Sequence, residues 1–60
     1  PDGASAYRGM GIVHQQRGNY KEAGAAFIKY LRLDPDAPDR PIIMADLQEL
    51  AEKIKAGSGE

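Results

Sequence analysis

Apolar side chains recur at helical intervals in three separate segments of this chain. In the first segment, the positions i, i+3, i+4 and i+7 are Tyr7, Met10, Gly11 and His14. This spacing places the four residues on one face of a helix, which we predict to span residues 4–16. The helix should end near Gly18, because glycine readily adopts the left-handed turn that terminates many helices.

The second segment predicts a helix over residues 20–33. Asn19 precedes it and Glu22 follows three residues later, a spacing typical of a capping box at a helix N-terminus. Pro35 disfavours helical geometry at the residue before it, so the helix should end near residue 33. The apolar face of this segment consists of Ala23, Ala26, Phe27, Tyr30 and Leu31.

The third segment predicts a helix over residues 39–56, with Asp39 as its N-cap and Gly57 just beyond its end. Its apolar face consists of Ile43, Leu47, Leu50, Ala51 and Ile54. Residues 57–60 are rich in glycine and serine, and we predict a flexible tail there.

These segments predict an all-α fold, because none of them alternates polar and apolar residues with the period of a strand. We expect a single domain over residues 1–56, made of an antiparallel helix-turn-helix hairpin and a third, capping helix in a right-handed arrangement. A glycine inside a helix costs about 1 kcal/mol relative to alanine. For Gly11 we expect compensation from a close approach of the first two helices, with Ala23 opposite.

The hairpin segment also carries the spacing of a known helical repeat. The matching positions are Tyr7, Met10, Gly11, His14, Gly18, Tyr20, Ala23, Phe27, Tyr30 and Pro35. In this respect residues 4–37 resemble a tetratricopeptide repeat, a helix-turn-helix unit of about 34 residues. Two positions depart from the family pattern, since His14 replaces a tyrosine and Tyr30 replaces an alanine. The larger ring of Tyr30 needs room, which we expect it to find against the third helix.

The resemblance implies where a partner would bind. The third helix fits a second repeat poorly and is similar to the closing helix that covers the last repeat of an array. Proteins of this family hold partners in a groove lined by the first helix of each repeat. The corresponding positions here are Ser5, Arg8, Ile12, Gln15 and Gln16.

Ile12 has two interpretations that the sequence leaves open. It is either exposed in the groove or a widening of the core stripe. Some members of the family clamp a peptide carboxylate with a lysine and an asparagine. Arg8 stands at the lysine position, but Ile12 replaces the asparagine, so this clamp is not expected here.

Composition narrows the range of partners. Lysine and arginine number 8, aspartate and glutamate number 9, and the two signs are interspersed, which disfavours nucleic acid and anionic membranes. No apolar run reaches the length of a membrane-spanning helix. The chain has no cysteine, which fits a soluble protein of the cytoplasm or of a bacterial periplasm.

The sequence offers little catalytic or metal-binding chemistry. His14 is the one histidine of the chain, and its place on the apolar face favours a structural role over acid–base chemistry. Asp34, Asp36 and Asp39 resemble the start of a calcium loop, but Asp39 stands where such a loop needs glycine and Ala45 where it needs glutamate. We therefore assign these aspartates to turns and caps, and predict no catalytic residue, no cofactor and no metal.

The sequence thus predicts a non-catalytic interaction module that holds a protein or peptide in the groove of the first helix, or that self-associates. The alternative is a structural role as the C-terminal cap or helical tail of a larger protein or enzyme. Uncovered side chains at Tyr7, Ile12 and Val13 would favour that alternative.

Overall fold

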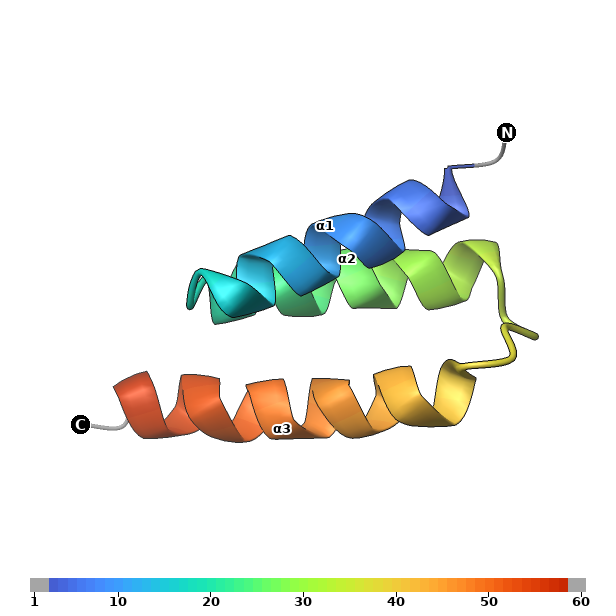
Figure 1. Ribbon diagram of the computed structural model, residues 1–60. Coiled ribbons are helices and arrows are strands. Elements are labelled where there is room, and N and C mark those ends of the chain that lie inside the picture. Colours follow the sequence, from blue (N-terminus) through green and yellow to red (C-terminus); the bar gives the residue numbers. More distant parts are fainter. Residues whose placement is uncertain (1–2, 59–60) are drawn as a thin grey trace.

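The computed structural model describes residues 3–58, which form three helices (Figure 1). These are α1 (Ala4–Gln16), α2 (Tyr20–Leu33) and α3 (Arg40–Ser58). Successive helices run in opposite directions, and α2 packs against both α1 and α3. No strand occurs in this part of the chain, so the predicted all-α fold of three helices is confirmed, with the third helix packed on α2.

The predicted bounds of α1 and α2 agree with the structure, whereas those of α3 do not. Helix α3 starts at Arg40 and continues through Gly57 to Ser58, so the stop predicted at Gly57 is wrong. Gly57 does not adopt the left-handed backbone that would end a helix, so α3 continues through residues 57–58. Of the predicted tail, residues 59–60 lie outside the described residues.

The connection between α1 and α2 is a Schellman turn centred on Gly18, whose φ of +81° is left-handed as predicted. The backbone N–H of Asn19 donates to the His14 carbonyl at 2.8 Å, and that of Gly18 donates to the Gln15 carbonyl at 3.1 Å. Asn19 is the N-cap of α2, but its side chain makes no capping hydrogen bond, so the predicted capping box is wrong. The turn brings Asn19 beside His14, and the amide nitrogen lies 3.5 Å from the ring Nδ1 instead.

The core is centred on α2 and is built from both of its neighbours. Phe27 is completely buried, and burying a phenylalanine side chain is worth about 1.5–3 kcal/mol. Its ring lies so close to α1 that a Cβ added at Gly11 would come within 2.6 Å of Cε1. The close approach at Gly11 is therefore confirmed, and the ring of Phe27 is the nearest group opposite it. The core cluster consists of Ala4, Ala23, Phe27, Tyr30, Ala37, Ile43 and Leu50.

Helix α3 uses most of its predicted apolar face. Ile43 and Leu50 are buried, and the half-buried Leu47 packs against the core. Leu47 also approaches Gly24, the small residue of α2 at this contact. Ala51 is exposed, contrary to prediction, because it lies at the edge of the contact with α2.

Helix α1 buries a narrower strip than predicted. Ala4 and Gly11 are buried and Tyr7 is half-buried, whereas the side chain of Met10 is 45% exposed. Among the helices of residues 3–58, α1 packs against α2 alone, so side chains on its flanks stay uncovered by the described chain. Of the four residues predicted to share one face of α1, Met10 is therefore the one that is exposed.

Candidate interaction surfaces

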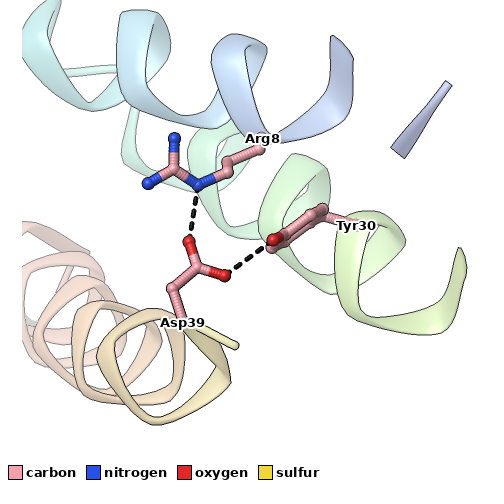
Figure 2. A network of polar contacts seen from close by, with 3 residues as sticks. All are labelled: Arg8, Tyr30 and Asp39. Atoms are coloured by element: carbon pink, nitrogen blue, oxygen red, sulfur yellow. Dashed lines mark hydrogen bonds and ion pairs between the residues drawn. The ribbon is translucent and has the colours of Figure 1, made fainter. Parts of the chain in front are cut away.

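Three side chains from different parts of the chain meet where α3 begins (Figure 2). The Asp39 carboxylate accepts a hydrogen bond from Arg8 Nε at 2.6 Å and another from the Tyr30 hydroxyl at 2.6 Å. Arg8 belongs to α1, Tyr30 to α2, and Asp39 directly precedes α3. One carboxylate thus connects all three helices.

The connection from α2 to α3 fixes the position of Asp39. Two turns, closed by the N–H groups of Ala37 and Arg40, bury Ala37 and bring the chain back along α2. The Asp39 carbonyl accepts the first helical hydrogen bond of α3, from Ile43, so the predicted N-cap position is correct. The predicted role of its side chain was incomplete, because the carboxylate contacts Arg8 and Tyr30.

These contacts shift the pKa values of the network. The hydrogen bond from Tyr30, followed by that from Arg8, holds the pKa of Asp39 below its ordinary value of 3.8. The hydrogen bond to Asp39 raises the pKa of Tyr30 above its ordinary value of 10.0, because it favours the protonated phenol. At neutral pH Asp39 is therefore ionised and Tyr30 protonated, the states in which both hydrogen bonds form.

The structure places the predicted first-helix residues on one flank of α1. Ser5, Arg8 and Gln16 are exposed, while Ile12 and Gln15 are half-buried. Ile12 packs against the core, which supports the second of its two interpretations, a widening of the core stripe. Arg8 is paired with Asp39, so little of this surface remains to hold a partner by charge.

A groove lies on the other flank of α1, where it runs beside α2. It has a volume of about 360 Å³, and we call it the α1–α2 groove. Its walls carry Met10, which stands two residues before Ile12 and therefore points to nearly the opposite side of the helix. At the rim of this groove, the Nζ of Lys29 lies 5.9 Å from the centre of the Tyr7 ring. The lining residues are Tyr7, Met10, His14, Glu22, Ala25, Ala26 and Lys29.

A second groove of about 350 Å³ lies between α2 and α3. It is also largely apolar and shares Ala25 with the first groove. Among the residues that line this groove, Ile28 is the most exposed large apolar one, with an exposed fraction of 47%. The lining residues are Lys21, Gly24, Ala25, Ile28, Leu47, Leu50, Ala51 and Ile54.

The candidates for chemistry lie apart from one another. His14 is half-buried, and its Nδ1 faces the Asn19 amide. Within residues 3–58, no three histidine, cysteine, aspartate or glutamate side chains lie close enough to hold a metal ion. Among the helices of the same residues, none is both long and apolar enough to cross a membrane.

Comparison with models of protein families, with curated proteins and with solved structures finds no match for this chain. The resemblance to tetratricopeptide repeats therefore stays a prediction.

Proposed function

We propose that this chain is a non-catalytic helical module, similar to a tetratricopeptide repeat, that binds another protein through the α1–α2 groove. The observation that carries the proposal is the groove itself, which is lined by apolar side chains and left open by the helices of the described residues. Met10 is the clearest single feature, because it lines the groove and is 45% exposed.

Protein-binding surfaces combine an apolar centre with a polar rim. In the α1–α2 groove the two alanines and Met10 form the centre, and Glu22 and Lys29 form the rim. A volume of about 360 Å³ accommodates one or two side chains of an amphipathic helix, which is a recurring way of binding a helix in a groove. Methionine suits such a site because its flexible side chain adapts to different partners.

The flank of α1 predicted from the family resemblance has a smaller role in this proposal. Ser5, Gln15 and Gln16 can donate and accept hydrogen bonds at the edge of a bound partner. The Arg8 side chain is hydrogen-bonded to Asp39, so we assign it to the stability of the fold and not to partner binding.

One observation favours the alternative, a structural cap in a longer protein. Val13 is 46% exposed and lies next to Met10 on the outer side of α1. A preceding helix laid along α1 would cover both side chains. Tyr7 and Ile12 are already half-buried within the chain, so they do not need such a helix.

Selection of helical peptides from a displayed library tests the proposal. Met10→Glu places a charge in the α1–α2 groove, and Met44→Glu is its matched control, since Met44 is 47% exposed on α3. We expect the selected peptides to lose at least about tenfold in affinity for the Met10→Glu variant. They should bind the Met44→Glu variant as they bind the unmodified chain.

Gln16→Glu probes the first-helix flank in the same assay. Peptides that respond to Gln16→Glu and ignore Met10→Glu would place the binding surface on that flank. Failure to select any peptide that depends on Met10 would refute the proposed function.

A further inference from the structure

The rim of the α1–α2 groove carries opposite charges in a symmetric arrangement. Glu22 and Lys29 are at positions i and i+7 of α2, so they lie on the same side of the helix and about 10 Å apart. Ala25 and Ala26 lie midway between them and line the same groove. The smallest side chains that α2 contributes to this groove thus lie at the midpoint of the charge pair.

Helix α1 carries two ring side chains with the same spacing around its own midpoint. Tyr7 and His14 also stand at i and i+7, and the Met10–Gly11 step lies midway between them. Gly11 packs against Phe27, so the midpoints of the two stripes lie at nearly the same level along the hairpin. A two-fold axis across the groove at this level would pass close to both midpoints.

From this arrangement we infer that the occupant of the groove is a second copy of this chain, in an isologous dimer. The inference rests on the proposed function, since it names the partner of the same groove. The axis lies in the plane of contact and runs perpendicular to the helices, so α1 packs antiparallel on α1 of the second copy and α2 on α2. Glu22 then faces Lys29 of the second copy, and every contact occurs twice.

Charge complementarity is what selects a second copy over other helices. A surface with an acidic residue on one side of its midpoint and a basic residue on the other is complementary to itself in the antiparallel orientation. A two-fold axis along the helices would instead lay α2 over α1 of the second copy, where Glu22 faces His14 and Lys29 faces Tyr7, so that neither charge meets its opposite. The small side chains of Ala25 and Ala26 let the two α2 helices approach closely at the axis.

The size of the face predicts a weak dimer. Each helix is about 20 Å long and the hairpin is about 20 Å wide, which gives a footprint of about 400 Å² per copy. Stable complexes bury about 800 Å² per partner. We therefore expect a dissociation constant on the order of 10⁻⁴ M, with dimers forming only in concentrated solution.

Sedimentation equilibrium of the 60-residue chain, from about 10 µM to about 1 mM, tests the inference. Glu22→Lys and Lys29→Glu each place like charges opposite each other at both ends of the interface. Each variant should weaken dimerisation at least about tenfold. The double variant Glu22→Lys/Lys29→Glu restores opposite charges and should dimerise within about threefold of the unmodified chain.

This rescue separates association from folding. Glu22 is the acidic residue in the first turn of α2, where it favours the helix dipole, and Lys29 lies beside the Tyr7 ring, so either substitution also removes a favourable interaction within the chain. The double variant keeps both of these losses, and its recovery can come only from pairing between copies. Circular dichroism of each variant shows that the helices are intact, and Glu52→Lys on α3 controls for the change in net charge.

A chain that stays monomeric at about 1 mM would overturn the inference, as would a dimer that ignores Glu22→Lys or a double variant that does not recover. Peptides that require Met10 would still support the proposed function in each of these cases. Loss of both peptide binding and dimerisation would instead remove the groove as an interaction surface.

Discussion

Alanine at position 11 should destabilise this protein, although alanine normally stabilises a helix. A Cβ at Gly11 would lie 2.6, 2.7 and 2.9 Å from Cε1, Cδ1 and Cζ of Phe27, all closer than real Cβ atoms approach other groups. The ring has no free space to move into, because Phe27 is completely buried between the helices. The hairpin must therefore open slightly, or the ring must leave its preferred rotamer.

The expected size of the effect follows from two opposing contributions. Replacing glycine by alanine in a helix gains about 1 kcal/mol. Overpacking a filled core by one methyl group costs about 1–3 kcal/mol, and three simultaneous short contacts with a rigid ring place Gly11→Ala at the upper end. The free energy of unfolding should fall by about 1–2 kcal/mol, which lowers the melting temperature of so small a domain by roughly 4–16 °C.

Gly9→Ala is the matched control in the same helix. A Cβ at Gly9 meets nothing within 4 Å, so this substitution should raise the free energy of unfolding by about 0.5–1 kcal/mol. Urea denaturation followed by circular dichroism, at a dilution that keeps the chain monomeric, measures both variants. Equal stabilisation by the two substitutions would show that Phe27 does not pack against Gly11 and would refute the reasoning.

Further predictions concern the network and the turn. Acidification below the ordinary pKa of 3.8 should lower the melting temperature of the chain more than that of Asp39→Asn, because the stabilisation from a lowered carboxyl pKa is complete above that value and is lost below it. Raising the pH above 10.0 should destabilise the chain more than Tyr30→Phe, since the stabilisation from a raised phenol pKa is lost as the phenol ionises. Gly18→Ala should cost about 1–2 kcal/mol in urea denaturation, because φ is +81° there. Asn19→Ala should cost less than the usual 1 kcal/mol or so of a lost N-cap, because Asn19 makes no side-chain capping bond.

The helices were predictable because local signals determine them. The apolar spacing of each segment gave the face that packs, and Gly18 and Pro35 gave the ends of α1 and α2. The end of α3 was missed because Gly57 is a stop signal only when its backbone becomes left-handed, and nothing in the sequence determines that. The Asn19 side chain was misjudged for a similar reason, because the turn geometry decides which group it reaches.

The network around Asp39 could not be deduced from one segment at a time. A residue with N-cap chemistry at a helix start is fully explained by its local role, and only the packing of α3 on α2 brings it to Arg8 and Tyr30. The sequence did hold one signal, the tyrosine at a position where the family has alanine. The expectation that Tyr30 finds its room near the third helix agrees with its hydrogen bond to Asp39.

The two uses proposed for the α1–α2 groove constrain each other. A helical peptide and a second copy of the chain would both cover Met10, so they compete for the same surface. The apparent affinity of a peptide should therefore fall as the chain becomes more concentrated and dimers form. In the Glu22→Lys variant dimerisation should be weakened at least about tenfold while Met10 is unchanged. A peptide held by apolar contacts should therefore bind this variant with an affinity that depends much less on chain concentration.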